Sequence, residues 1–112
     1  MKIVNSSVSK EEVLEKYNHF FKNMLKAVVD IKKEVIALDG ELHADLEGLL
    51  IEAGSKQEDV WGINLYLRKS PKERIEYTAL INIRPSQDNP SMEVEKTQTR
   101  KKIEKIVSKI IN

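Results

Sequence analysis

Apolar and polar residues alternate along the chain with two different periods, and these periods predict where strands and helices lie. Alternation over residues 60–67 and 75–84 predicts two paired strands, whose successive side chains point to opposite faces. Two β-branched runs, residues 26–31 and 34–38, are separated by only two lysines. This spacing predicts a tight antiparallel hairpin.

Helical spacing of apolar residues begins after a capping box at residues 9–12, where a Ser hydroxyl and a Glu carboxylate bind unpaired main-chain amides. The apolar positions of this predicted helix are Val13, Leu14, Tyr17, Phe20, Phe21 and Met24. A last helix is expected to begin near residue 97 or 99. Its apolar stripe is Ile103, Ile106, Val107, Ile110 and Ile111.

Residues 44–54 allow two interpretations. Asp45 suits the N-cap of a short helix, and Gly54 suits the left-handed residue that ends one. The alternative is a continuing strand, because Gly48 inside a helix costs about 1 kcal/mol.

The elements therefore follow in the order β-α-β-β-α-β-β-α, with a strand at the N-terminus. This order predicts an α+β fold in which an antiparallel sheet carries helices on one face. No repeat, linker or low-complexity tract divides residues 1–112, so we expect a single two-layer domain.

Composition narrows the classes of function. The chain has 112 residues, of which 33% are charged and 40% apolar, and a formal net charge of +1. This total charge does not by itself attract DNA, RNA or an anionic membrane. The lack of cysteine excludes disulfides, cysteine-ligated zinc, iron–sulfur clusters and a thiol nucleophile. No window is apolar enough for a signal peptide or a membrane helix, so we expect a cytoplasmic protein with no membrane partner.

Polar side chains collect on one face of the two strands predicted at residues 60–67 and 75–84. If the odd-numbered residues face the helices, Asn64, Asn82 and Arg84 face away from them and form a recognition surface. The alternative is a face that is simply solvated, as in many antiparallel sheets. Tyr66 and Leu80 are expected on the same face. Together they would form an apolar patch that could bind a second copy of the chain.

The loop at residues 84–91 continues from the second of these strands and is stiffened by two prolines. A guanidinium binds phosphate or carboxylate through two parallel hydrogen bonds. We therefore hypothesise a site for an anionic small molecule, a nucleotide or an RNA phosphate. The candidate ligand-binding residues are Asn64, Asn82, Arg84, Ser86, Gln87 and Asn89. The alternative is a structured turn in which these side chains bind main-chain groups.

Glu41, His43 and Asp45 lie on one side of the chain if their segment is extended. Such a set suits a His general base held by a carboxylate, or the ligands of a divalent metal ion. Because the set contains a single His, we predict no bound metal. With Arg84 stabilising developing charge, His43 and Asp45 are candidate catalytic residues of a metal-independent hydrolase or ribonuclease. The alternative is that Asp45 caps a helix and His43 ends a strand.

Phosphate-binding, dinucleotide-binding, zinc-protease and serine-hydrolase motifs are absent from the sequence, and we predict no cofactor. Three polar motifs, ELHADLEGLL, GSKQEDVWGIN and INIRPSQDN, precede RKKIEKIV. From about Ile3 to Ile110, the chain resembles a family of small uncharacterised bacterial and archaeal proteins, a domain of unknown function. That family has a basic residue where this chain has Pro90, and its last helix opens with Asp-Pro-Glu where this chain has Lys-Thr-Gln at 96–98. The resemblance implies no activity, substrate or catalytic residue.

Three hypotheses follow, in order of preference. The first is a small binding module with its site near residues 84–91. The second is a structural or regulatory homodimer, and the third is a small hydrolase. They depend on whether residues 41–45, 55–59 and 84–91 meet in the folded chain.

Overall fold

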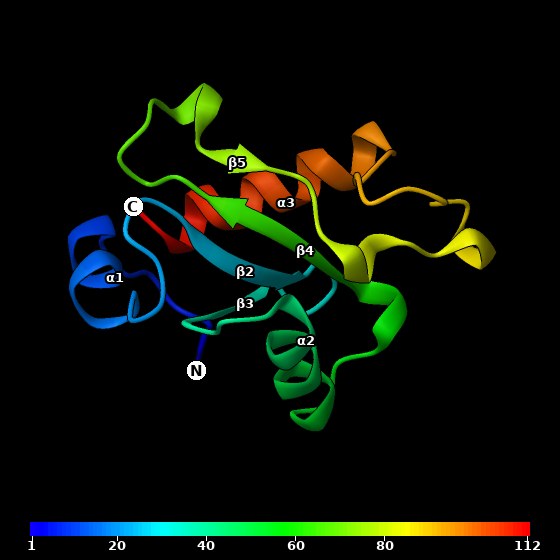
Figure 1. Cartoon of the computed structure of the whole chain (residues 1–112), viewed down its shortest axis with the longest axis horizontal. Helices are drawn as coiled ribbons and strands as arrows, with labels where there is room; N and C mark the ends of the chain where they lie inside the picture. The colour runs from blue at the N-terminus through cyan, green and yellow to red at the C-terminus, as the bar shows by residue number, and fades with distance from the viewer.

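A computed structural model describes residues 1–112 and contains five strands and three α-helices (Figure 1). In chain order these are β1 (Lys2–Val4), α1 (Lys10–Lys16), β2 (Leu25–Asp30), β3 (Val35–Leu38), α2 (His43–Glu52), β4 (Val60–Leu65), β5 (Ile75–Glu76) and α3 (Thr97–Ile110). The strands form one antiparallel sheet in the order β1-β3-β2-β4-β5. The predicted α+β class and order of elements are confirmed. None of the helices is both long and apolar enough to span a bilayer.

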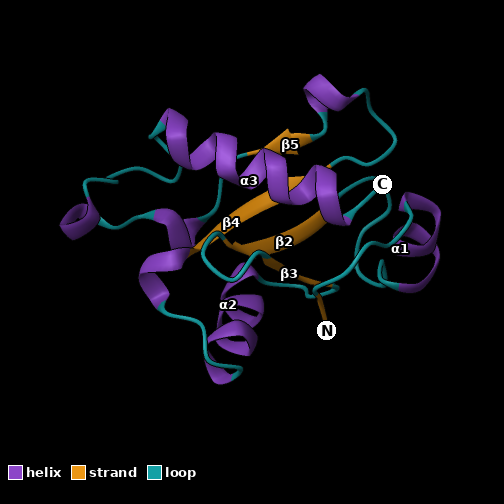
Figure 2. Ribbon diagram, turned by 180° about the vertical axis from the view of Figure 1, so that it is seen from behind, coloured by secondary structure: helices purple, strands orange, loops and turns teal.

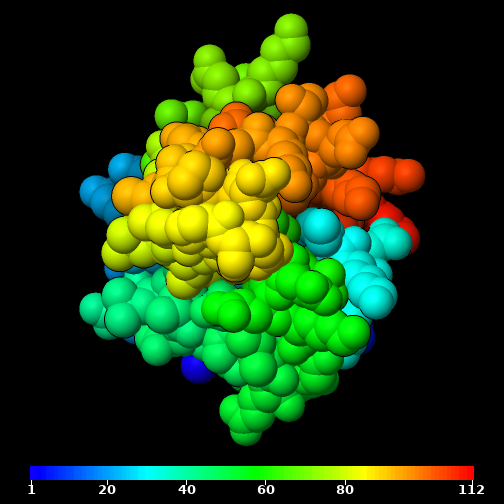
Figure 3. Space-filling view, turned by 90° about the vertical axis from the view of Figure 1, so that its right-hand side faces the viewer, coloured from blue at the N-terminus to red at the C-terminus, as the bar shows by residue number.

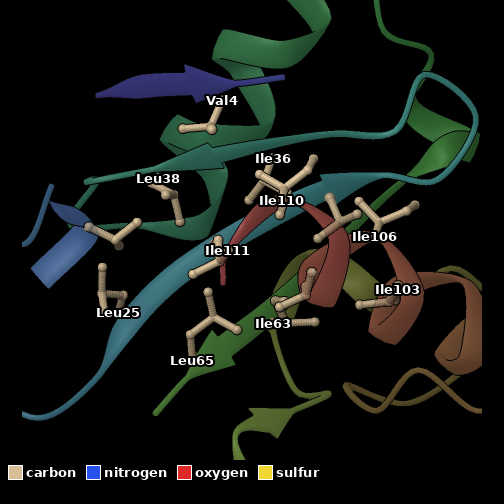
Figure 4. Close-up of a cluster of buried hydrophobic side chains, with 14 of the residues drawn as sticks. Val4, Leu25, Ile36, Leu38, Ile63, Leu65, Ile103, Ile106, Ile110 and Ile111 are labelled. Carbon is tan, nitrogen blue, oxygen red and sulfur yellow. The ribbon is translucent and has the colours of Figure 1, made fainter. Parts of the chain in front are cut away.

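The larger hydrophobic core lies between the sheet and α3. Figure 2 shows α3 lying along one face of the sheet, across β4 and β2. Side chains from β2, β3 and β4 gather with those of α3, among them Leu25, Ile63 and Ile106 (Figure 4). Burying such residues removes apolar surface from water, which is the main favourable contribution to folding.

The opposite face of the sheet is covered by α2, so the expectation of helices on one face is wrong in this detail. Leu46 and Leu50 of α2 pack with Val28 of β2, Ala37 of β3 and Val60 of β4 in a second, smaller cluster. The reason lies in the central strands. Because consecutive residues of β2 are apolar and fully buried, both faces of the sheet need cover.

Helix α1 is shorter than the apolar pattern predicts. Ser9 caps it as expected, with Oγ accepting a hydrogen bond from Glu12 N at 3.1 Å. However, the helix ends at Lys16, and Phe20 is 50% exposed. The physical reason is the side chain of Asp39, which accepts hydrogen bonds from both the main-chain N–H and the ring of His19. These contacts hold the chain after α1 in a non-helical path.

The strand predicted at residues 75–84 is also much shorter, because β5 ends at Glu76 and a 3-10 turn follows at Leu80–Asn82. The side chain of Asn82 explains the change. Its amide accepts from Gly62 N at 2.8 Å and donates to Gly62 O at 2.9 Å. It thus supplies β4 with the donor and acceptor that a longer neighbouring strand would have offered.

The segment at residues 43–52 is a helix, which settles the two sequence interpretations. As predicted, Gly54 ends α2 with a positive φ of 109°. Gly54 N donates to Ile51 O and Ser55 N to Leu50 O, the hydrogen-bond pattern of a Schellman motif. The N-cap is Leu42 rather than Asp45, which lies in the first turn.

Candidate functional site

A groove of about 420 Å³ opens on the α2 face of the sheet, between the start of α2 and residues 78–81. Seven of its eleven lining residues are hydrophobic. The apolar lining consists of Met24, Leu42, Ala44, Ala79, Leu80, Ile81 and Met92, and the polar lining of Lys26, His43, Asn64 and Thr78. A mostly apolar hollow with a few converging polar groups is typical of small-molecule sites.

Strand pairing brings two of the polar groups together. Lys26 of β2 and Asn64 of β4 are register partners, so their side chains lie next to each other on the same face. Lys26 makes no ion pair with any carboxylate, and its ammonium group lies 5.3 Å from the ring centroid of Phe21. The groove therefore contains one cation without an acidic partner.

The side chain of Asn64 has an unused acceptor. Its Nδ2 donates to Glu76 Oε1 at 2.7 Å and to the main-chain oxygen of Thr78 at 3.3 Å. Its Oδ1 is buried and makes no hydrogen bond. Since nearly all buried polar atoms in folded proteins are paired, this oxygen is the most distinctive polar atom of the groove.

His43, the first residue of α2, is held by the main chain of β4. The distance from its Nε2 to Ile63 O is 2.8 Å, and because a carbonyl oxygen only accepts, Nε2 carries the proton. Burial lowers the pKa of His43, and the charge of Lys26 adds to this effect. Hydrogen bonds of the charged ring to the Ile63 carbonyl and to the Asn64 side chain oppose it. A neutral ring held this way leaves Nδ1 as an acceptor or a base.

Arg84 is buried, and main-chain oxygens occupy its donors. Nε donates to Ile81 O at 3.0 Å, and Nη1 donates to Gln57 O at 2.7 Å. Nη2 donates to Val60 O and lies 3.4 Å from a carboxylate oxygen of Glu47. Desolvation lowers the pKa of Arg84 and raises that of Glu47, and for each group the partner's charge opposes the shift.

Asn82 and Asn89 are also buried, and their side chains bind main-chain groups. This agrees with the alternative in which residues 84–91 form a structured turn. The Nδ2 of Asn89 donates to the main-chain oxygens of Asn82 and Glu93, both at 2.7 Å, and its Oδ1 accepts from Glu95 N. These contacts lock the path of the chain from β5 toward α3.

The loop at residues 84–91 does meet the loop at residues 55–59. Gln87 Nε2 donates to Glu58 O at 3.2 Å, and Figure 3 shows the yellow loop packed against the green segment. Ser86 is exposed at the surface. Of the six candidate ligand residues, only Asn64 lines the groove. Ligand binding by the other five stays a prediction.

The candidate catalytic residues do not come together as an acid–base set. Because α2 begins at His43, the extended spacing with Glu41 and Asp45 does not form, and Asp45 is exposed. His43 has no carboxylate hydrogen-bond partner, and Arg84 does not line the groove. The structure contains no group of three His, Asp or Glu side chains arranged to hold a metal ion.

Two features of this region escaped the sequence analysis. The sequence predicts a hairpin that contains Lys26 but no role for this residue, although its parity within β2 places it beside Asn64. His19 lies after the end of α1 with its side chain exposed, and its Nδ1 lies 2.6 Å from Asp39 Oδ2. No local pattern links His19 to a residue 20 positions away, so only the fold reveals that pair.

Fold and groove together define a small α+β protein with a mostly apolar groove beside its sheet, lined by four polar side chains. The chain belongs to the family described as "Protein of unknown function (DUF5674)", whose model matches residues 2–110. No curated protein and no solved structure matches the chain.

Proposed function

We propose that the protein is a small binding module whose groove holds a flat, largely apolar ligand with hydrogen-bonding groups, of the kind that a nucleobase offers. The observation that carries this proposal is the unpaired Oδ1 of Asn64 in a mostly apolar hollow. A ligand N–H or O–H placed against this oxygen would satisfy a buried acceptor, which otherwise costs about 1–3 kcal/mol.

The neighbouring polar groups refine the chemistry of the ligand. Lys26 favours an anionic or electron-rich group, because no carboxylate of the protein neutralises it. The neutral ring of His43 offers a further acceptor at Nδ1. These groups support an anion- or nucleotide-binding module, with the binding site beside His43 and Asn64 rather than at Arg84.

The test is a titration of the ¹⁵N-labelled protein with uridine, adenosine and benzoate, followed by amide chemical shifts. We expect saturable shifts at residues 24–26, 42–44 and 78–81 for at least one nucleoside. Asn64→Ala should weaken this binding about two- to tenfold through the lost hydrogen bond. Asn5→Ala, beyond β1 at the other edge of the sheet, is the matched control and should leave binding unchanged. Shifts confined to other surfaces, or none with any probe, would contradict the proposal.

The exposed apolar rim of the groove favours a second candidate, a homodimer or regulatory interaction protein. Leu80 is 71% exposed, Leu42 53% and Met92 39%. Exposed apolar patches of this kind often mark protein–protein contacts. The hydrolase hypothesis has less support, because a lone His43 lacks a carboxylate that orients it.

A further inference from the structure

A second hollow, of about 410 Å³, lies beside the turn that follows β4. It is lined by Asn23, Tyr66, Arg68 and Lys69. In Figure 1 this turn, in light green, leads from the end of β4 toward β5. Arg68 Nη1 donates to Lys22 O at 3.3 Å, so the turn is attached to the segment that leads into β2.

Two of the four residues that line the hollow, Arg68 and Lys69, are cations that no carboxylate neutralises. Residues 66–74 contain four basic residues and one acidic residue, and Lys22 directly precedes the lining residue Asn23 and is exposed. None of these basic side chains takes part in an ion pair. Unpaired, exposed lysines and arginines around a hollow attract phosphate groups.

An aromatic ring lies among these cations. Tyr66 is half-buried, and the ammonium group of Lys69 lies 4.5 Å from its ring centroid. Aromatic side chains inside a positively charged groove are the usual means of binding single-stranded nucleic acid, because each base can stack on a ring. The segment at residues 68–74 has no exposed large apolar side chain, which a membrane-inserting loop would need.

The hollow and the groove lie next to each other along β4. Asn64 and Tyr66 are two residues apart on the same side of an extended chain, so their Cα atoms are separated by about 7 Å. On the facing segment, Asn23 lines the hollow and the next residue, Met24, lines the groove. One ligand can therefore reach both.

We propose that the protein binds single-stranded nucleic acid along this face, with phosphates held by Arg68, Lys69 and Lys22 and one base stacked on Tyr66 or inserted beside Asn64. This inference rests on the proposed function for the groove and names the class of its ligand. The hollow contributes charge and stacking, while the groove contributes hydrogen bonds to a base.

The test measures fluorescence anisotropy of a labelled oligouridylate and of an oligothymidylate of the same length. For about three phosphate contacts, affinity should fall about 20-fold when salt rises from about 50 to 200 mM. Arg68→Gln/Lys69→Gln should weaken binding at low salt at least about tenfold and reduce the salt effect to about threefold. Tyr66→Leu should weaken binding about tenfold with little change in the salt effect.

The control variant Lys32→Gln/Lys56→Gln removes the same charge from exposed positions outside the hollow and should retain affinity within about twofold. Thermal melting checks that each variant is folded. Equal weakening in the control, no binding by the wild type at low salt, or tighter binding to duplex DNA or phosphatidylserine vesicles would overturn the inference.

Two partial ligands separate the inference from the proposed function. Uridine carries no phosphate and reports on the groove, whereas tripolyphosphate carries no base and reports on the hollow. If uridine binds in an Asn64-dependent way but the oligonucleotide binds no tighter, the inference fails and the proposed function stands. If the oligonucleotide and tripolyphosphate depend on Arg68 and Lys69 while Asn64→Ala has no effect, the proposed groove function fails and the charged hollow stands.

Discussion

His43 shows how the environment of one side chain sets its pKa and makes folding stability depend on pH. Because burial lowers its pKa below 6.5, the unfolded chain takes up a proton at a higher pH than the folded chain does. Folding stability therefore decreases as the pH falls through 6.5, and stops decreasing once the pH is below the pKa of the folded state.

We predict that His43→Gln removes this contribution, while the Gln amide can still donate a hydrogen bond to Ile63 O. Urea unfolding between about pH 7.5 and 5 measures the free energy of unfolding of both proteins. As the pH falls, the wild type should lose more stability than the variant. NMR of the wild-type ring should show the Nε2–H tautomer at neutral pH. A ring that titrates above 6.5, or parallel stability profiles, would contradict the prediction.

The asparagines illustrate how one residue type serves two purposes. Asn82 is fully buried and hydrogen-bonded on both sides of its amide. Asn64 has its amide nitrogen bound and its oxygen free. The first is part of the scaffold, and the second is the candidate ligand contact.

At the scale of elements, β4 carries the site because the segment at residues 78–82 lies directly against it. A Cβ added at Gly62 would lie 2.5 Å from the Cβ of Ala79, 3.1 Å from Ile81 Cγ1 and 3.2 Å from His43 Cδ2. Only glycine allows this close approach, and it brings one wall of the groove toward the other.

We predict that Gly62→Ala lowers the free energy of unfolding by about 1–3 kcal/mol, as overpacking does. It should also displace the amide signals of residues 78–82. Gly48→Ala is the matched control in α2, since an added Cβ there meets no atom within 4 Å. That substitution should raise stability by about 0.5–1 kcal/mol, and urea unfolding measures both. A harmless Gly62→Ala would mean that the two segments are not in contact.

Across the whole molecule, the small net charge conceals an uneven distribution. Residues 39–59, which include α2, contain seven acidic residues and one lysine. Residues 66–74 and 96–109 together contain ten basic and two acidic residues. Because α2 and α3 cover opposite faces of the sheet, the acidic segment and the basic α3 are separated in space.

The oligomeric state distinguishes the two candidate functions at this scale. A stable dimer usually buries about 800 Å² on each partner, which three exposed apolar side chains at a groove rim do not provide. We therefore predict that light scattering gives the monomer mass of 12.9 kDa over a range of concentrations. A dimer mass that Leu80→Asp reduces to the monomer would favour the interaction protein instead.

The sequence by itself determined the order of the elements, although it left residues 44–54 open between a helix and a strand. The Ser9 N-cap, the hairpin around two lysines and the left-handed end at Gly54 were all predicted and confirmed. Each of these signals acts within a few residues, through alternation, capping or a permitted backbone angle, so a linear chain contains all the information needed.

Only the tertiary structure decided which polar side chains are open to a ligand. The alternation of side chains places Asn82 and Arg84 on one face only if the strand continues through Arg84. The chain instead leaves the sheet after Glu76. The partners that turn Asn82 and Arg84 inward, Gly62 and Gln57, lie 20 and 27 positions away along the chain. Contacts across such distances depend on how helices and strands pack, and no local pattern of residues encodes them.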